Sequence, residues 1–338
     1  MRPKIFSKQA RIGKGTEYKD TYQSTLEELF FVRNPKFRKG SPEAKKPLAK
    51  FLKKSRIKPV WISYPKKGVV VKSLPEKEYF ELRTARNRNL ITADEQKKFR
   101  DAVAGIAGLS VGSSIVAALA LSGGPKRMKL ADPDTLEATN LNRIRAGIAD
   151  IGRKKTDIIA DYIWNMDPFA KLYLFHEGIV SATLEKFILG APKLDIFIDE
   201  MDNLSLKAAA RRLCRSAKIP VLMATDNGDG VILDVERYDR EPKTKLFNGR
   251  VPEPALENLE NVDRKKWLTI VKKIIGTKDM TKRHRHAIRE IGILISGIPQ
   301  LGATASLAGA TVSYAVRKLV NREALPSGRY LLNLEAVF

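Results

Sequence analysis

The sequence has little cysteine and histidine, and this scarcity excludes several classes of protein. Its 338 residues include one cysteine, Cys214, and three histidines. A single cysteine can form neither an intramolecular disulfide nor a cysteine-rich zinc site, so we expect no structural zinc. The N-terminal segment also lacks the apolar run of a secretory signal. We therefore predict a cytoplasmic protein.

Two long stretches, 102–125 and 291–316, contain no charged residue. Each is long enough to raise the question of a membrane-spanning helix. Both are rich in Gly, Ala, Ser and Thr, and Pro299 interrupts the second. This composition favours the buried core of an α/β domain for both stretches, and we expect no membrane association.

Acidic residues are scarce relative to basic ones, mainly near the N-terminus. The chain has 62 Lys+Arg and 38 Asp+Glu, a net charge of +24. Residues 1–100 contribute +17 of this, with 27 basic and 10 acidic residues, and the other 238 residues contribute +7. We interpret residues 1–83 as a basic extension, irregular to residue 58 except for a helix over 24–32, with a β-hairpin over 60–71. Its charge suits a nucleic-acid backbone.

Strand and helix patterns alternate from residue 100 onward. Apolar β-type runs alternate with helical periodicity, and this alternation is typical of an α/β fold with a doubly wound, mostly parallel, Rossmann-like sheet. We predict strands over 103–107, 127–131, 171–175, 194–198 and 221–224, and helices over 114–121, 156–165 and 206–217.

A glycine turn joins the first predicted strand to its helix. Gly108, Ser110 and Gly112 lie in this turn, where backbone N–H groups can approach a phosphate at the positive end of a helix. A tight packing turn without a ligand explains the pattern equally well. Asp132 follows the second strand, where a carboxylate can accept hydrogen bonds from a ribose; it could also be a helix cap or a solvated acid.

Further polar residues follow in positions that suit a triphosphate. Asn140, Arg143 and Lys155 offer hydrogen-bonding and cationic groups, although a solvated loop is the simpler alternative. Asp202 follows the strand at 194–198, where hard oxygen ligands suit Mg²⁺. It could instead cap the helix that begins next.

The order of these motifs resembles that of the ThiF/MoeB superfamily of adenylating enzymes, which includes the ubiquitin-activating enzymes. The resemblance covers residues 84–240, with a weaker similarity over 302–317. We accordingly divide the chain into the extension 1–83, a ThiF-like domain 84–240, and a substrate-side insertion with a final helix over 241–338. The matching motifs are Arg86-Asn87-Arg88-Asn89-Leu90-Ile91, Glu95-Gln96, the glycine turn, Asp132, Asn140 to Arg143, Gly152 to Lys155, Asp202-Asn203, and Cys214 to Pro220.

The resemblance implies a reaction of Mg-ATP with a carboxylate, giving an acyl-adenylate and pyrophosphate. The carboxylate would belong to a protein C-terminus or a small molecule. The implied roles are the nucleotide turn for Gly108, Ser110 and Gly112, the ribose for Asp132, the phosphates for Asn140, Arg143 and Lys155, and the Mg²⁺ for Asp202. Arg88 matches an arginine that family dimers supply to the ATP of the partner subunit, which implies a homodimer.

The sequence departs from the family pattern in two respects. The paired CxxC motifs of many relatives are absent, and no cysteine stands at a thioester position. Cys214 matches a cysteine that packs inside the domain, so we expect it to be buried and structural. Two alternatives to an adenylyltransferase remain: a nucleotide-binding scaffold or sensor without turnover, and a ThiF-like dehydratase that modifies transfer RNA.

Overall fold

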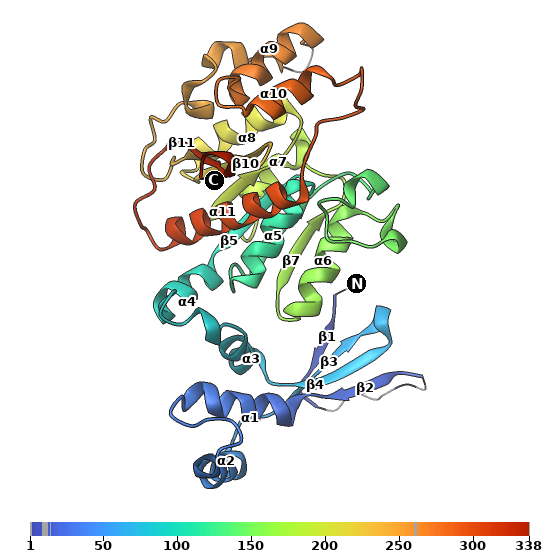
Figure 1. Cartoon of the computed structure of the whole chain (residues 1–338), viewed down its shortest axis with the longest axis vertical. Helices are drawn as coiled ribbons and strands as arrows, with labels where there is room; N and C mark the ends of the chain where they lie inside the picture. Colours follow the sequence, from blue (N-terminus) through green and yellow to red (C-terminus); the bar gives the residue numbers. More distant parts are fainter. Residues whose placement is uncertain (1, 9–12, 14, 260–261, 338) are drawn as a thin grey trace. The chain divides into compact units, whose positions relative to one another are not determined.

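The computed structural model describes residues 2–8, 13, 15–259 and 262–337, and the chain divides into two compact units (Figure 1). Unit 1 contains Met1–Ala93 and Ile163–Ala170, whereas unit 2 contains Asp94–Tyr162 and Lys171–Phe338. Unit 1 is therefore built from two separate segments of the chain. The three-part division drawn from the motifs stays a prediction.

Unit 1 contains a four-stranded sheet in the order β1-β3-β4-β2. β3 pairs antiparallel with β4, which confirms the predicted hairpin, and Gly68 adopts the left-handed conformation (φ 60°) that its turn requires. The sequence did not predict β1 and β2, which flank the hairpin as outer strands. The strands are β1 (Lys4–Phe6), β2 (Glu17–Asp20), β3 (Val60–Tyr64) and β4 (Val69–Ser73).

Three helices complete the N-terminal segment of unit 1: α1 (Tyr22–Arg33), α2 (Pro42–Lys54) and α3 (Glu76–Arg83). The prediction of an irregular chain was wrong for α2. Pro42 lies at the start of this helix, where proline has no hydrogen bond to lose, and Pro47 lies in its second turn. Apolar residues from all three helices and from β4's C-terminal end form a small core. That packing outweighs the propensity of Pro47 to break the helix.

Unit 2 contains a seven-stranded sheet in the order β11-β10-β9-β8-β5-β6-β7. The strands from β9 to β7 run parallel, and β10 and β11 add two antiparallel strands at one side. This arrangement confirms the predicted α/β class with a mostly parallel, Rossmann-like sheet. The strands are β5 (Val103–Ala107), β6 (Arg127–Ala131), β7 (Lys171–Phe175), β8 (Ile196–Asp199), β9 (Val221–Asn227), β10 (Gly230–Glu236) and β11 (Gly328–Asn333).

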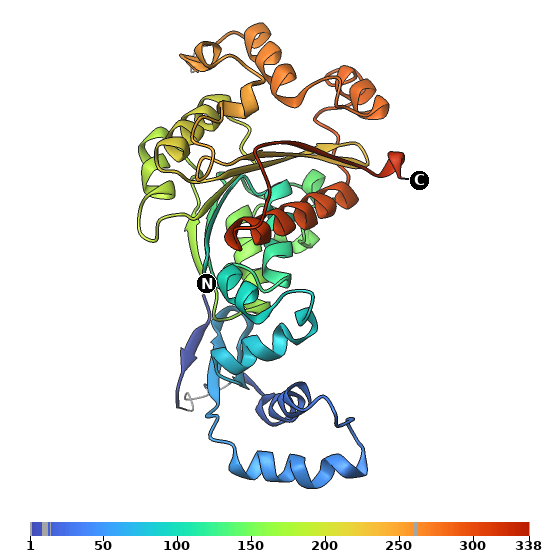
Figure 2. The ribbon, with the colours of Figure 1, turned by 90° about the vertical axis from the view of Figure 1, so that its left-hand side faces the viewer.

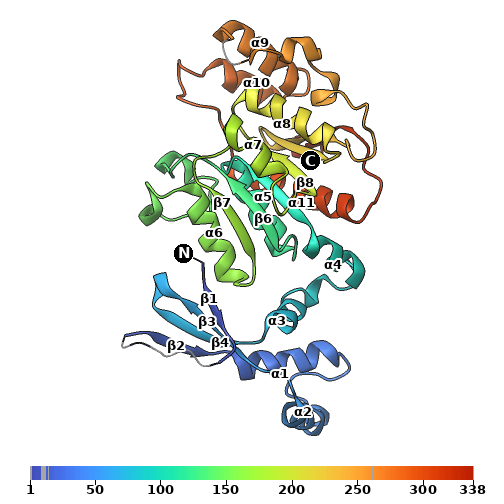
Figure 3. The ribbon, with the colours of Figure 1, turned by 180° about the vertical axis from the view of Figure 1, so that it is seen from behind.

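Helices cover both faces of this sheet. The two helices α5 (Val111–Leu121) and α11 (Gly302–Val320) pack closely together on one face, which confirms the predicted late helix (Figure 2). The helices α7 (Ser181–Ile188) and α8 (Leu204–Ser216) lie on the other face (Figure 3). The remaining helices are α4 (Ala93–Asp101), α6 (Lys155–Met166), α9 (Arg264–Ile275) and α10 (Lys282–Arg289).

The two charge-free stretches have different structures. Residues 102–125 form β5, the glycine turn and α5, and most of them are buried, as predicted. The prediction of a buried core was wrong for the beginning of the second stretch, because Ile293, Leu294 and Ile298 are 75%, 78% and 63% exposed. None of the helices in the described part of the chain has the length and apolar character that a bilayer-crossing helix requires.

Candidate functional site

The glycine turn lies at the carboxyl edge of the sheet, between β5 and α5. Gly108 has a left-handed backbone (φ 91°), and a Cβ at this position would clash with the carbonyl oxygen of Glu200. Its N–H donates to Ala131 O at 2.8 Å, which joins the turn to the end of β6. Ser110 immediately precedes α5, and Gly112 lies in the first turn of this helix. The free N–H groups of that first turn therefore open at the edge where α/β sheets bind ligands.

Asp132 fixes the turn from the neighbouring strand end. One carboxylate oxygen accepts a hydrogen bond from Leu109 N at 2.6 Å, and the other accepts one from Asp134 N at 2.9 Å. Burial raises the pKa of Asp132, and nearby Lys155 opposes this shift. Lys155 Nζ lies 2.7 Å from Asp134 Oδ2 and 3.8 Å from Asp132 Oδ1. The structure thus brings Asp132 and Lys155 together beside the turn.

Arg143 reaches the turn from the loop after β6. Its Nε donates to Ser110 Oγ at 2.8 Å. Asn140 shapes this loop, because its buried side-chain oxygen accepts from Glu137 N at 3.1 Å and its carbonyl oxygen accepts from Arg143 N at 3.1 Å. Burial lowers the pKa of Arg143, whereas two carboxylates, from Asp226 and Asp202, act in the opposite direction. Both carboxylates therefore lie near the same guanidinium group.

Asp202 is exposed and lies between β8 and α8. The alternative that it caps α8 was wrong, because Asn203 is the cap and its side chain accepts from Leu206 N at 3.0 Å. Among the described residues, no group of three or more His, Cys, Asp or Glu side chains is arranged to hold a metal ion. A cation such as Mg²⁺, which takes much of its coordination from phosphate and water, still suits this position.

The sequence gave no indication of Asp226, which lies near the end of β9 at the same edge. We had predicted that this strand ends at residue 224, so the predicted strand did not include Asp226. Its side chain is buried, and neither carboxylate oxygen has a hydrogen-bond partner within the described residues. Burial raises its pKa from 3.8 to about 6, against the influence of Arg143 and the Gln300 side chain. The next strand end thus carries a second carboxylate beside Arg143.

The buried acid Asp199 differs from Asp226 in being neutralised. Asp199, at the end of β8, forms ion pairs with Arg211 and with Lys207, the latter at 3.2 Å. Arg211 also donates to Glu236 Oε2 at 2.7 Å. Lys207 and Arg211 hold the pKa of Asp199 below its ordinary value although the side chain is fully buried. This network belongs to the core and has no group free for a ligand.

Cys214 is fully buried, and burial raises the pKa of its thiol. This confirms its predicted structural position in α8. Arg88 belongs to unit 1, where its guanidinium donates to Val32 O at 3.0 Å and to Glu81 Oε1 at 3.2 Å. It is therefore not one of the residues that unit 2 gathers at the carboxyl edge of its sheet.

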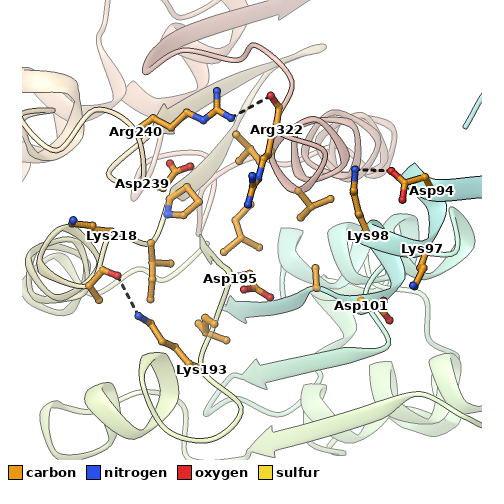
Figure 4. Close-up of a pocket in the computed structure, with 18 residues that line it drawn as sticks. Asp94, Lys97, Lys98, Asp101, Lys193, Asp195, Lys218, Asp239, Arg240 and Arg322 are labelled. Atoms are coloured by element: carbon orange, nitrogen blue, oxygen red, sulfur yellow. Dashed lines mark hydrogen bonds and ion pairs between the residues drawn. The ribbon is translucent and has the colours of Figure 1, made fainter. Parts of the chain in front are cut away.

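A cavity of 980 Å³ lies at the opposite, amino edge of this sheet (Figure 4). The C-terminal ends of α4, α8 and α11 border it, and side chains there bind their carbonyl groups, as Lys193 Nζ does with Ala217 O at 3.3 Å. Lys98 pairs with Asp94 in the same wall. No predicted site residue lines this cavity, so we place the candidate site at the carboxyl edge.

The chain is similar in sequence to known proteins. The sequence model of the ThiF family matches residues 84–334. An uncharacterized protein of Mycobacterium tuberculosis is 34% identical over 276 residues, which is 82% of this chain and 38% of that protein. The tRNA threonylcarbamoyladenosine dehydratase of Bacillus subtilis is 27% identical over 163 residues, which is 46% of this chain and 62% of the dehydratase. The chain thus spans less than two thirds of the length of either relative.

The fold is also found among solved structures. The crystal structure of selenomethionine PaaA aligns with 77% of this chain and 80% of its own, with a TM-score of 0.55 and 20% sequence identity. At this level of identity the similarity concerns the fold alone.

Proposed function

Because the chain belongs to the ThiF family, we propose that it is an adenylyltransferase that uses Mg-ATP to activate a carboxylate as an acyl-adenylate. The observation that carries this proposal is the convergence of the glycine turn, Asp132, Arg143 and Asp202 at one edge of the sheet. A turn that presents backbone N–H groups, with a cation and acids around it, suits a nucleotide triphosphate bound with a metal ion.

The residues of the turn and of β6 would position the nucleotide. Backbone N–H groups at Ser110 and in the first turn of α5, near Gly112, would receive phosphate oxygens. Asp132 would accept from the ribose with the lone pairs that its hydrogen bonds to Leu109 N and Asp134 N leave free. Gly108 allows the close approach of the turn to the chain after β8.

Cationic and polar side chains would hold the phosphate groups. Arg143, already bonded to Ser110, would contact the phosphates with its remaining donors, and Asn140 would keep the Arg143 loop in place and add contacts of its own. Lys155 would exchange its pairing with the exposed Asp134 for a phosphate oxygen. A bound Mg²⁺, held by Asp202, would neutralise charge on the phosphates and the leaving pyrophosphate.

Adenylation suits a carboxylate substrate because a carboxylate is a poor electrophile. The carboxylate oxygen would attack the α-phosphorus of ATP, the bond to the pyrophosphate would break, and the product would carry AMP as a good leaving group. Cys214 is buried and its thiol pKa is raised, so it is unsuited to take the acyl group as a thioester. An amine, thiol or hydroxyl from outside this chain would then attack the adenylate.

The proposal includes a homodimer in which Arg88 serves the ATP bound to the partner subunit. Arg88 is exposed, and its present partners are a backbone carbonyl and an exposed ion pair that cost little to break. Mixing Arg88→Ala with Lys155→Ala protomers should restore part of the lost activity, since each mixed dimer contains one intact site. Verified mixed dimers without recovery would contradict this role.

The test of the proposal is ATP–pyrophosphate exchange. The protein is incubated with ATP, Mg²⁺, labelled pyrophosphate and fractions of a deproteinised cell extract as the source of carboxylates. We expect exchange by the parent protein, its loss in Asp202→Ala, and parental exchange in the control Glu185→Ala, which changes an exposed acid on α7. Equal exchange by Asp202→Ala would refute the metal role, and ATP binding without exchange would favour a sensor or scaffold.

A second candidate is a dehydratase that activates the carboxylate of a modified adenosine in transfer RNA. The similarity to the Bacillus subtilis dehydratase and the exposed basic face of α2 favour it. Because the apolar face of α2 packs into the core of unit 1, its basic face is left to meet phosphate groups. The exposed cations of this face are Lys45, Lys46, Lys50, Lys53 and Lys54.

Transfer RNA bearing the modified adenosine distinguishes the two candidates. The dehydratase would convert it, with ATP consumption, into a product that lacks one water molecule by mass spectrometry. RNA affinity should fall steeply with salt, and replacing Lys46, Lys50 and Lys53 by glutamine should flatten that dependence. RNA binding that is unaffected by these changes would contradict the role of α2.

A further inference from the structure

Asp226 is a buried acid at the candidate site, and Arg143 and the Gln300 side chain offset only part of the effect of its burial. The residue is 7% exposed, and both of its carboxylate oxygens lack a hydrogen-bond partner there. Its half-buried neighbour Glu200 differs, because one oxygen of Glu200 accepts from Ala224 N at 2.8 Å. A buried carboxylate without partners is costly and rare in folded proteins, so its presence calls for a partner that arrives from outside the chain.

The register of the sheet brings Asp226 to the edge where the segment that carries Asp202 leaves β8. β8 and β9 run parallel, and Phe197 pairs with Val221 and Ile198 with Leu222, a constant offset of 24 residues. The contact between Glu200 and Ala224 shows that the two segments still lie side by side at the same offset two residues further on. Asp202 and Asp226 have this offset too. Neighbouring strands are about 4.8 Å apart, so side chains from two adjacent strand ends can share a small cation.

The charges around the site favour a divalent cation as the missing partner. Asp202 and Asp226 both raise the pKa of the Arg143 guanidinium, so both acids lie near the same cation. A single guanidinium cannot neutralise two carboxylates together with a triphosphate, and repulsion between the acids and the phosphates would weaken nucleotide binding. A divalent cation removes that repulsion, because carboxylate and phosphate oxygens are its preferred ligands.

We propose that Asp226 is a second carboxylate ligand of the divalent cation that Asp202 would hold. This inference rests on the proposed function, since the remaining ligands would be phosphate oxygens of ATP and water. Asp226 and Asp202 would hold the cation between the ends of β8 and β9, and the cation would neutralise the charge of both carboxylates, which leaves Arg143 free for the phosphates. Asp202, being exposed, would hold the solvent side of the same cation.

Binding of Mn²⁺ tests this assignment without any reaction. The free Mn²⁺ signal in electron paramagnetic resonance is titrated with the full chain, with and without a non-hydrolysable ATP analogue. We expect Asp226→Asn to weaken Mn²⁺ binding about tenfold or more, as loss of a carboxylate near a metal commonly does, and Asp202→Asn to do the same. Asp229→Asn, three residues further along on the following turn, is the matched control and should bind Mn²⁺ like the parent.

The outcomes separate this inference from the proposed function. Parental Mn²⁺ affinity in Asp226→Asn, or no Mn²⁺ binding by the parent protein, would overturn the assignment. Calorimetric titration with the ATP analogue in EDTA measures nucleotide binding separately, so its failure would count against the proposed function instead. A thermal melt of each variant shows whether the fold is retained, and an asparagine at 226 removes an uncompensated charge and should not unfold the chain.

Discussion

Two buried aspartates at the ends of adjacent strands have opposite surroundings. Asp199 ends β8 and pairs with Arg211 and Lys207, which hold its pKa below the ordinary value. Asp226 lies near the end of β9 without a hydrogen-bond partner among the described residues, and burial raises its pKa to about 6. The chain thus neutralises Asp199 with its own cations and leaves Asp226 available to a ligand. Burial alone does not distinguish a structural acid from a ligand; direct ion pairs and hydrogen bonds to the carboxylate do.

The largest effect is expected where the internal counter-charge is removed. Arg211→Met leaves Glu236 buried without its cation and leaves Asp199 with Lys207 alone, although methionine retains much of the side-chain volume. Losing one partner of a buried ion pair typically costs about 3–5 kcal/mol of the free energy of unfolding. Urea denaturation would measure this loss. The control Arg212→Met changes the exposed neighbour on α8. If it lowered the free energy of unfolding as much as Arg211→Met does, the loss would not come from the buried ion pairs of Arg211.

A smaller effect of opposite sign is expected for Asp226→Asn. The pKa of Asp226 in the folded chain is about 6, above its ordinary 3.8, so ionisation of this group destabilises the fold. The cost is absent below about pH 4, grows as the pH rises to about 6, and reaches roughly 1–3 kcal/mol above that, given about 1.4 kcal/mol for each pKa unit.

Thermal melts from pH 4 to pH 8 measure this difference. The asparagine variant should be more stable than the parent at pH 8 and equal to it at pH 4. A variant that is less stable at pH 8 would mean that the ionised carboxylate is satisfied in the folded protein. The comparison with Asp199 would then lose its basis.

The smallest effect is expected at the amino edge of the sheet. Lys98 and Asp94 form an exposed ion pair in the wall of the cavity there, with side chains 52% and 70% exposed. Lys98→Ala should change the free energy of unfolding by less than about 0.5 kcal/mol and leave ATP–pyrophosphate exchange at the parental rate. Loss of exchange in this variant would move the functional site to the cavity.

Local patterns in the sequence predicted the part of the site that depends on neighbouring residues. The strand, glycine turn and helix from 103 to 121 follow one another directly, so their composition was sufficient to predict them. Asp202 and its strand end were found in the same way. Each of these features needs only about twenty consecutive residues to be recognised.

The features that sequence analysis missed depend on distant segments of the chain. The position of Asp226 at the candidate site depends on the register between β8 and β9, which no local sequence pattern encodes. The pairing of Arg211 with Glu236 joins residues that lie 25 positions apart on a helix and a strand. α2 was missed because tertiary packing of its apolar face outweighs the helix-breaking propensity of Pro47.

The two-segment construction of unit 1 bears on how this protein can be divided or recombined. Its second segment, Ile163–Ala170, includes the end of α6, the helix whose first residue is Lys155. The hydroxyl of Tyr79 donates to Met166 O at 2.6 Å, and the Tyr79 ring packs on Phe169. Unit 1 therefore cannot be removed by deleting the N-terminal segment alone. A truncated chain starting at residue 94 would retain the second segment of unit 1 without the first segment that it packs against. A chimera between relatives would have to exchange both segments together.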